Sequence, residues 1–434
     1  MRPSISHKPL CLVLAAALCA AGVWLYANRV LIPYQKSDAA AHDRGRGNLS
    51  DLYPSWLAAR ELLLRGRDPY SPAVTREIQQ GYYGRPLDPA RPGDPKDQQR
   101  FAYPVYVAFG LAPTIHLPFE IVGKGFFWLL LGFTVVAIPL WLRVLRWSVP
   151  LWTQASLMVF TIGSLTVVQG LKLQQLSLLV AALLAIAMAL LVSDRPIAAG
   201  IALALATIKP QLVWLLLFWL TMWTFADWRR RYRWAASFLF TMAILGAASE
   251  WYLPHWIPRF LHAMREYQNY TDTASILDVL VPAPWGWMAR VLAGAATLQI
   301  GWKNRRFSEQ TPAFAATASL VLAMTIIIIP SYHFYNQVLL LPALLLLLRD
   351  RLFLWKRNRL NRALLSLAAI LLAWPWLASA ALAGLSFVLP RETAEQAWAI
   401  PFWTVIPFPV AVAALMLVHD YQGIFTASAG PGTS

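Results

Sequence analysis

Long apolar runs separated by short polar clusters make up most of this chain. The first run, from about Leu10 to Ala27, is longer than the apolar region of a usual signal peptide, so we expect a retained membrane helix. Similar runs predict eleven further spans, at 121–142, 150–168, 173–192, 197–208, 212–227, 234–250, 286–302, 312–330, 337–348, 363–388 and 401–418. The pattern therefore predicts an all-α polytopic membrane protein with about 12 transmembrane helices.

The runs divide the chain into four parts. We expect a first transmembrane helix at 1–28, an external loop at 29–119, a multi-span domain at 120–419 and a short cytoplasmic tail at 420–434. Orientation follows from the basic residues, because 18 of the 37 Lys and Arg lie in segments on the side of the N-terminus and only 7 lie in short loops on the other side. Both ends are therefore predicted to be cytoplasmic and the long loop to be outside.

The external loop contains one amphipathic stretch, DLYPSWLAARELLLRG. Its apolar positions recur at helical spacing: Leu52, Trp56, Ala59 and Leu63. Three charged positions are expected to be available to water: Arg60, Glu61 and Arg67. This pattern predicts a helix that lies on the bilayer surface. The later stretch FAYPVYVAFGLAPTIHLPFE is apolar but interrupted by proline, which favours a broken or re-entrant helix.

Composition narrows the class of protein further. The 434 residues are 58% hydrophobic and only 13% charged, which is too apolar for a water-soluble enzyme of this length. The net charge of +16 lies in short clusters between apolar runs, where it fixes orientation rather than binding nucleic acid. Both cysteines, Cys11 and Cys19, lie in the first apolar run, so they support neither a disulfide framework nor a metal site.

Three polar features are predicted to converge on the outer face. Asp51 opens the amphipathic stretch of the loop. Lys209 and Gln211 lie at a break between two short helices in LATIKPQLVW. Tyr332 and His333 interrupt two very apolar segments in IIIIPSYHFYNQVLLLP. Because ionisable groups near membrane depth are costly unless they face a cavity, we expect a cavity that unites an acid, a cation and an imidazole.

Each of these residues also has a purely structural interpretation. Asp51 directly precedes a helix and fits an N-cap. Lys209 fits a side chain that snorkels to the interface, and a Lys followed by Pro is an ordinary helix boundary. His333 lies between tyrosines and fits an aromatic belt at the headgroups. Sequence position leaves these alternatives open for each residue, and only the convergence of all three on one face favours a site.

Several landmarks follow one another in a set order. After the early acid of the loop come a Gly-x-Asp-x-Tyr turn (Gly66, Asp68, Tyr70), a Tyr-Pro element (Tyr103, Pro104), a Gln pair (Gln174, Gln175) and Lys-Pro-Gln (209–211). Over roughly residues 45 to 350, this series resembles glycosyltransferase family 87, whose members are GT-C-type membrane glycosyltransferases. The chain departs from the family pattern at Val105, where a second Pro is usual, and before the Gln pair, where no Gly stands directly.

The resemblance implies a GT-C-like fold and a definite reaction. A mannose- or arabinofuranose-like sugar would move from a polyprenyl-phosphate donor to a lipid or glycan acceptor, with inversion, at the outer face of the plasma or inner membrane. It implies Asp51 as the general base, which takes the proton of the acceptor hydroxyl. It also implies Lys209 and Gln211 at the donor phosphate, where fixed donors meet the charge of the leaving group.

The remaining assignments follow less directly from the resemblance. His333 is assigned to phosphate stabilisation or acceptor positioning. Further residues are assigned to substrate binding: Tyr332, Tyr103 and Gln175. Rival acids are expected on the same face: Asp68, Glu250 and Asp278. No metal or other cofactor is expected, because the sequence has no Asp-x-Asp motif of the kind that serves nucleotide sugars.

A different class of function also fits this pattern. A secondary transporter or lipid flippase would likewise place its site at interrupted helices. Against this alternative, the second half of the chain does not repeat the first, and the amphipathic loop has no counterpart. A non-catalytic scaffold for envelope assembly is a third interpretation. The sequence identifies neither the sugar nor the acceptor.

Overall fold

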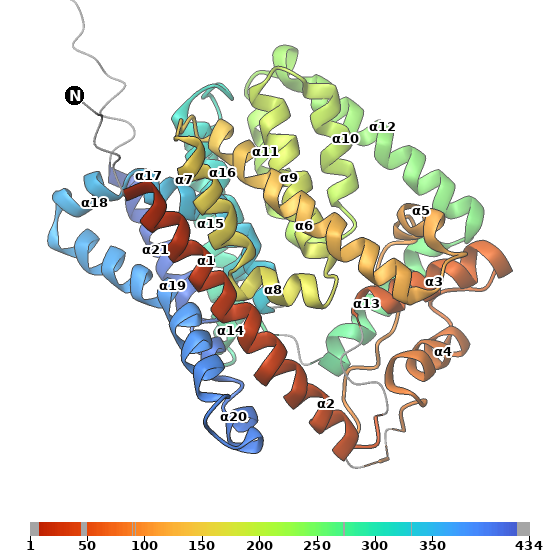
Figure 1. Cartoon of the computed structure of the whole chain (residues 1–434). Helices are drawn as coiled ribbons and strands as arrows, with labels where there is room; N and C mark the ends of the chain where they lie inside the picture. Colours follow the sequence, from red (N-terminus) through yellow and green to blue (C-terminus); the bar gives the residue numbers. More distant parts are fainter. Residues whose placement is uncertain are drawn as a thin grey trace, which may run out of the picture.

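The computed structural model describes residues 8–44, 50–88, 90–91, 93–271, 274–330 and 332–422 (Figure 1). All regular secondary structure in these residues is helical. The α-helices are α1 (Lys8–Tyr26), α2 (Ile32–Ala41), α3 (Leu52–Arg65), α4 (Pro72–Tyr83), α5 (Val107–Leu111), α6 (Phe119–Val144), α7 (Leu151–Ile162), α8 (Leu165–Lys172), α9 (Leu176–Val192), α10 (Pro196–Ala206), α11 (Trp214–Phe225), α12 (Trp228–Tyr252), α13 (Trp256–Thr271), α14 (Ile276–Leu280), α15 (Gly286–Lys303), α16 (Pro312–Ile328), α17 (Leu341–Arg349), α18 (Arg351–Arg357), α19 (Arg359–Leu385), α20 (Arg391–Gln396) and α21 (Pro407–Gln422).

Five further helical turns complete the backbone. They are the π-helical turn η1 (Ala27–Leu31) and the 3-10 segments η2 (Ala112–Thr114), η3 (Pro210–Leu212), η4 (Phe334–Leu340) and η5 (Ile400–Phe402). Most of the tail predicted at 420–434 lies outside the described residues, which end at 422.

Several segments are long and apolar enough to cross a membrane. Four qualify on their own: Leu10–Ala41, Phe119–Val144, Arg359–Leu385 and Arg391–His419. The number rises to six if two bent helix pairs each count as one span, and the pair α7 and α8 is bent by 59°. Other predicted spans fold as apolar helices of only 10–17 residues. The all-helical membrane protein is therefore confirmed, while the figure of about 12 spans stays a prediction.

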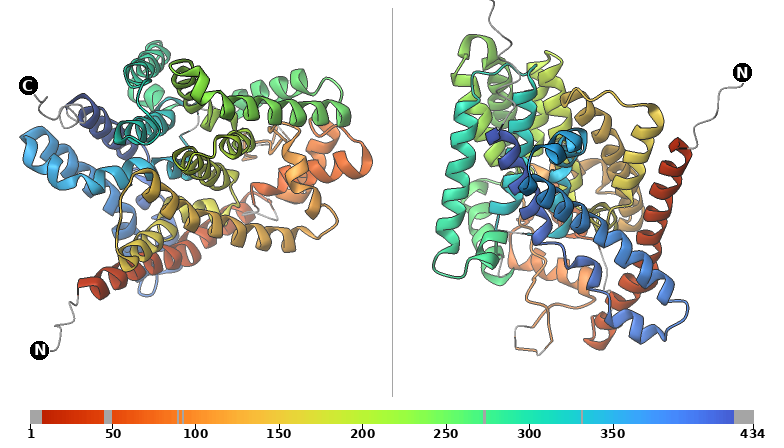
Figure 2. Two further views of the ribbon diagram at one scale, coloured as in Figure 1. Left: turned by 90° about the horizontal axis from the view of Figure 1, so that it is seen from above. Right: turned by 90° about the vertical axis from the view of Figure 1, so that its left-hand side faces the viewer.

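The first helix continues past the boundary predicted at residue 28. α1 passes through η1 into α2 and ends at Ala41. Pro33 explains the π-helical turn, because a proline has no N–H and its ring clashes with the carbonyl four residues earlier unless the helix widens there. Val30 and Leu31 in this segment are fully buried, so the extension is part of the folded body. In both views of Figure 2, α1 lies along the outside of the helix bundle.

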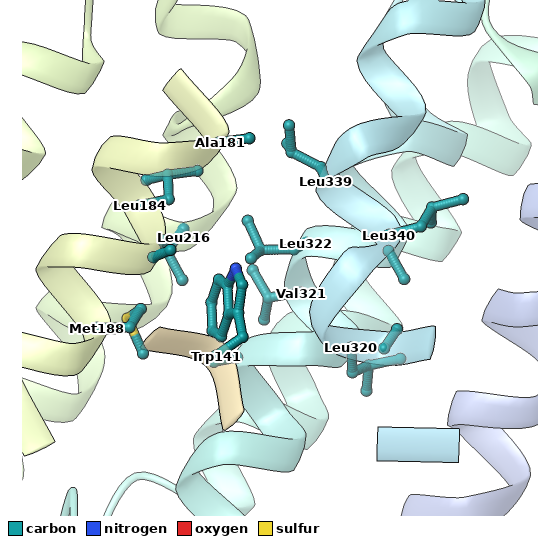
Figure 3. Packing of buried hydrophobic residues seen from close by; sticks show 14 of the residues in the cluster. Trp141, Ala181, Leu184, Met188, Leu216, Leu320, Val321, Leu322, Leu339 and Leu340 are labelled. Atoms are coloured by element: carbon teal, nitrogen blue, oxygen red, sulfur yellow. The ribbon is translucent and has the colours of Figure 1, made fainter. Parts of the chain in front are cut away.

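The largest hydrophobic core lies in the middle of the bundle. It joins residues of α6, α9, α10, α11, α16, η4, α17 and α21. Every residue of α16 from Ala313 to Ile328 is buried, as expected for a helix that is apolar on all sides. Figure 3 shows Trp141 of α6 among side chains of α9, α11 and α16. This core holds the first turn of α9 and the break after α10 in fixed positions, and both carry polar residues of the site described below.

The segment between α2 and α6, which we call the loop body, packs against α6, α9 and α13. It contains α3, α4 and α5, at the end of the molecule that also carries α13 (Figure 1). The stretch predicted as a broken helix forms only α5 and η2, because its prolines stop any longer helix. α3 is enclosed rather than lying free on a surface, since most of its residues are buried.

One charged residue of α3 departs from its prediction. Glu61, expected to be available to water, is only 2% exposed. Its carboxylate accepts hydrogen bonds from Arg65 at 2.9 Å and from Arg67 at 2.6 Å. A buried carboxylate needs such partners to offset the loss of hydration. Both guanidinium groups follow Glu61 by only a few residues, so the charge is neutralised locally while α3 packs inward.

Candidate active site

A polar cavity of about 350 Å³ lies where the loop body meets the helix bundle. Its walls come from segments that are far apart in the sequence: the start of α3, the segment before α5, the start of α9, the break after α10, α13 and η4. The polar lining residues are Asp51, Asp97, Gln99, Arg100, Tyr103, Gln175, Lys209, Gln211, Tyr267, Gln268, His333, Tyr335 and Asn336. This is the kind of mixed polar and aromatic cavity that binds a polar ligand.

Asp51 is placed in this cavity by the turn before α9. Its backbone N–H donates to the carbonyl of Leu173 at 2.9 Å, and the hydroxyl of Ser50 donates to the same carbonyl at 3.1 Å. The Asp51 carboxylate does not cap α3. Instead, the Ser50 hydroxyl accepts a hydrogen bond from the N–H of Leu52 at 3.0 Å. The structure therefore does not support the N-cap interpretation, and the carboxylate is free for other contacts.

Two side chains hold the Asp51 carboxylate. The side-chain amide of Gln175 donates to Oδ2, and the hydroxyl of Tyr82 donates to Oδ1 at 3.3 Å. Burial raises the pKa of Asp51 above its usual value, while the hydrogen bond from Gln175 and the nearby charge of Lys209 lower it. A carboxylate with a raised pKa, fixed beside a cavity, is suited to accept a proton.

Lys209 is joined to Asp51 through Gln175. Its Nζ donates to Oε1 of Gln175 at 2.7 Å and to the hydroxyl of Ser177 at 2.9 Å. Ser177 in turn donates to Oδ1 of Asn336 at 2.6 Å. Lys209 is only 6% exposed. A buried ammonium requires hydrogen-bond partners of this kind, so Lys209 is a fixed part of the cavity wall rather than a snorkelling side chain.

Aromatic rings complete the surroundings of this cation. Nζ of Lys209 lies 5.8 Å from the ring centroid of Tyr103 and 5.3 Å from that of Tyr335. The electron-rich faces of such rings favour a cation at this distance. The Tyr335 ring stacks with His333, with 5.3 Å between centroids and 27° between planes. His333 is itself exposed and lines the same cavity.

Comparison with known families decides what kind of protein carries this cavity. The model of glycosyltransferase family 87 matches residues 101–330, which is more than half of the chain. The chain belongs to glycosyltransferase family 87. It is therefore a glycosyltransferase, in agreement with the resemblance found in the sequence. No curated protein and no solved structure matches it.

The family match covers part of the cavity. Tyr103, Gln175 and Lys209 lie within the matched residues. Asp51 and His333 lie outside them, and the fold brings both to the same cavity. All predicted site residues line this cavity except Tyr332, which packs against the large hydrophobic core.

The three rival acids of this family 87 glycosyltransferase do not line the cavity. Asp68 accepts hydrogen bonds from the N–H of Tyr70 at 2.9 Å and from Arg259 at 2.6 Å, so it stabilises the turn after α3. Asp278 closes a capping box at the start of α14 and pairs with Arg290 at 3.2 Å. Glu250 accepts from the N–H of His255 at 2.7 Å. Each carboxylate has a structural role where it stands.

The structure also adds an acid that the sequence did not suggest. Asp97 lines the cavity, and its carboxylate accepts hydrogen bonds from the backbone N–H of Gln99 at 2.9 Å and from the side chain of Gln99 at 3.0 Å. Burial raises its pKa to about 6, and the charge of Asp51 contributes in the same direction. Asp97 belongs to an irregular stretch rich in Gly and Pro, which carries no periodic signal from which a site could be predicted.

The raised pKa of Asp97 leads to a test by stability. An ionised Asp97 costs the folded state free energy, so wild-type stability falls as the pH rises from the usual carboxyl value through about 6. We expect Asp97→Asn to melt at a higher temperature than wild type at pH 8, with the difference shrinking towards pH 4. Thermal unfolding in detergent across this range measures the effect. A constant difference at all pH values would mean that Asp97 does not titrate as described.

The turn that positions Asp51 explains one departure from the family pattern. Gln174 has φ of +47°, in the left-handed region that glycine adopts most easily. Its side-chain amide donates to the carbonyls of Leu171 at 2.9 Å and Lys172 at 3.1 Å, which holds the turn without a glycine. Gln174, directly before Gln175, thus holds a backbone conformation that a glycine would adopt without strain.

This turn provides a further prediction. We expect Gln174→Gly to fold and to keep near-normal transfer, because relief of the left-handed strain offsets the loss of two hydrogen bonds. Gln174→Val is expected to lose roughly 1–2 kcal/mol of stability and to lose transfer, since a β-branched residue is strained at positive φ. Melting temperatures and transfer rates of the two variants check this. Equal behaviour of Gly and Val would show that the backbone conformation at residue 174 is unimportant.

Proposed function

We propose that this glycosyltransferase moves a mannose- or arabinofuranose-like sugar from a polyprenyl-phosphate donor to a lipid or glycan acceptor. The observation that carries the proposal is the linkage of Asp51 to Lys209 through Gln175 at the wall of one polar cavity. An acid that accepts a proton and a cation that meets a phosphate are the two groups that this reaction requires. In this proposal the GT-C-like architecture serves to bring them together at the end of the bundle.

Asp51 acts as the general base in the proposed mechanism. The acceptor hydroxyl attacks the anomeric carbon, and its proton passes to the Asp51 carboxylate as the new C–O bond forms. The bond from the anomeric carbon to the phosphate oxygen breaks on the opposite face of the sugar, so the configuration inverts. Gln175 and Tyr82 keep the carboxylate in one orientation through their hydrogen bonds, which reduces the entropy lost on reaching the transition state.

Lys209 stabilises the leaving phosphate in the proposed mechanism. An ammonium has three N–H donors, and the described residues accept two of them, at Gln175 and Ser177. The third is available to a phosphate oxygen in the cavity. Gln211 and His333 line the same cavity. In this mechanism Gln211 donates to the phosphate, and His333 contacts the phosphate or the acceptor. A positive charge already fixed in place requires no reorganisation when charge develops on the phosphate.

A direct assay tests this proposal. The purified protein is incubated with polyprenyl-phosphate mannose or polyprenyl-phosphate arabinofuranose and a membrane lipid extract, and products are followed by mass spectrometry. We expect a new glycolipid or glycan that wild-type protein forms and Asp51→Asn protein does not. The transporter or flippase alternative predicts movement of the lipid-linked sugar across a vesicle membrane without a new glycosidic bond.

The proposed function also requires a defined side of the membrane. The distribution of Lys and Arg predicts that α4 lies outside and the segment between α15 and α16 inside. Ala73 on α4 and Arg306 are both exposed, so a cysteine at either position can be labelled. In a background with Cys11 and Cys19 changed to Ala, we expect Ala73→Cys to react with an impermeant reagent in intact cells and Arg306→Cys only after permeabilisation. The reverse pattern would place the cavity on the cytoplasmic face.

A further inference from the structure

A second cavity, of about 620 Å³, lies on the other side of η4 from the polar cavity. Its walls come from α7, α8, η4, α17, α18, α19 and α21, and they are almost entirely apolar. η4 separates the two cavities: its residue Asn336 lines the polar cavity, and the next residue, Gln337, lines the apolar one. We call this second cavity the apolar groove. Its volume lies in the range of about 300–1,000 Å³ that is usual for ligand sites.

Four of the polar groups that line the apolar groove already have hydrogen-bond partners within the protein. The hydroxyls of Thr161 and Ser164 donate to helix carbonyls, each at 2.7 Å. The side chain of Gln337 donates to the carbonyl of Val405 at 2.6 Å, and the indole of Trp376 donates to that of Gly163 at 2.9 Å. None of these four groups needs water as a partner. The lining therefore favours hydrocarbon rather than water as the content of the groove.

The two ends of the apolar groove differ in character. At one end Trp376 of α19 bonds to Gly163, and Gly163 packs directly against Ala20 of α1, so these helices close the groove. At the other end, which we call the mouth, lie Arg351 and Trp355 of α18. Figure 1 shows α18 at the end of the molecule where α1 begins, opposite to α3 and α4. The groove is therefore apolar along its length and basic at its mouth.

The mouth has the features of a membrane interface. α18 exposes Leu352 and Phe353, at 64% and 54%, beside several basic residues. This is the composition of a helix that lies at the headgroup level of a bilayer. Within the described part of the chain, the Arg351 guanidinium donates only to the carbonyl of Leu348 at 2.8 Å and forms no ion pair. Its charge is thus available to an anion outside the protein.

We propose that the apolar groove binds an anionic phospholipid, with its acyl chain along α19 and its phosphate at Arg351. Charge complementarity selects this occupant, because an apolar slot that ends in an unpaired arginine among basic residues matches a negatively charged headgroup above a hydrocarbon chain. The phospholipid is distinct from the sugar donor, whose phosphate is assigned to the other side of η4. The bound lipid would pack against η4 on the side away from the polar cavity. η4 carries Asn336, which accepts a hydrogen bond from Ser177, and Ser177 accepts one from Lys209.

Lipid binding to purified protein tests this inference. Delipidated protein is titrated with phosphatidylglycerol, with phosphatidylcholine and with polyprenyl phosphate, and binding is followed by native mass spectrometry and thermal unfolding. We expect phosphatidylglycerol to bind and to raise the melting temperature more than phosphatidylcholine does. Arg351→Gln is expected to weaken phosphatidylglycerol binding about fivefold, because one basic residue at the headgroup is lost.

Two further variants make the test specific. Arg362→Gln removes an exposed arginine near the start of α19 that does not line the groove, and it should bind phosphatidylglycerol as wild type does. Ala369→Trp places an indole at an exposed position in the groove wall and should block binding. Equal losses for the two arginine variants, or unchanged binding by Ala369→Trp, would overturn the inference. So would preferential binding of polyprenyl phosphate that Ala369→Trp abolishes, since the groove would then hold the donor chain.

Discussion

Asp51→Asn is expected to reduce glycosyl transfer by about 10²-fold or more, while the protein folds and inserts normally. The substitution keeps the shape of the side chain but removes its ability to accept the proton of the acceptor. Stability should change little, because Ser50 rather than Asp51 caps α3 and the backbone of Asp51 remains bonded to Leu173. Initial rates of product formation and melting temperatures of both proteins measure the two effects separately.

Matched acids control for this result. Asp68→Asn and Glu250→Gln change carboxylates outside the cavity and should keep transfer within a few-fold of wild type. Asp97→Asn changes the second carboxylate in the cavity and should affect transfer less than Asp51→Asn does, because Asp97 has no link to Lys209. Full activity of Asp51→Asn together with loss in any one of these variants would assign the base to another acid.

Lys209→Gln is expected to lower kcat/KM for the polyprenyl-phosphate donor by about 10- to 100-fold. A hydrogen bond to a charged group contributes roughly 1.5–3 kcal/mol, and the neutral amide cannot replace the charge. A second effect follows from the position of Lys209 near Asp51. Its positive charge lowers the pKa of the carboxylate, so its removal should move the acidic limb of the pH–rate profile to higher pH.

A neighbouring lysine supplies the control for Lys209. Lys172 also donates to a glutamine side chain, that of Gln35, but it does not line the cavity. Lys172→Gln should therefore leave the dependence of rate on donor concentration close to that of wild type. If both variants weaken donor use equally, or if Lys209→Gln leaves it unchanged, Lys209 does not bind the phosphate.

The sequence predicted the helical class and six of the residues that line the cavity, because both depend on strong local signals. Apolar runs of sufficient length indicate membrane helices whatever they pack against. The Lys-Pro-Gln motif located Lys209 and Gln211, and both line the cavity. The bend between α7 and α8 was also encoded locally, since Ser164 caps α8 by accepting a hydrogen bond from Val167. The prediction of one continuous span at 150–168 nevertheless missed this bend, because the sequence stays apolar across the bend.

Other features depend on partners that are distant in the sequence. α12 begins at Trp228, before the predicted span at 234–250. The extra turns include Arg231, which is buried because it donates to the carbonyls of Trp223 and Arg305. No local pattern distinguishes this buried arginine from its exposed neighbours. Asp97 likewise became a site residue only because an irregular loop folds back to the cavity.

The hydrogen-bonded chain from Asp51 to Asn336 has a consequence for how the enzyme is made. Its members come from four segments, and the ribosome delivers Asp51 to the membrane long before Asn336 is translated. Gln175 and Lys209 are translated during that interval, but Asn336, which accepts a hydrogen bond from Ser177, is missing until η4 is made. We therefore expect the complete chain of contacts to form only after η4 has been made, and a chain truncated before η4 to lack the contact between Asn336 and Ser177.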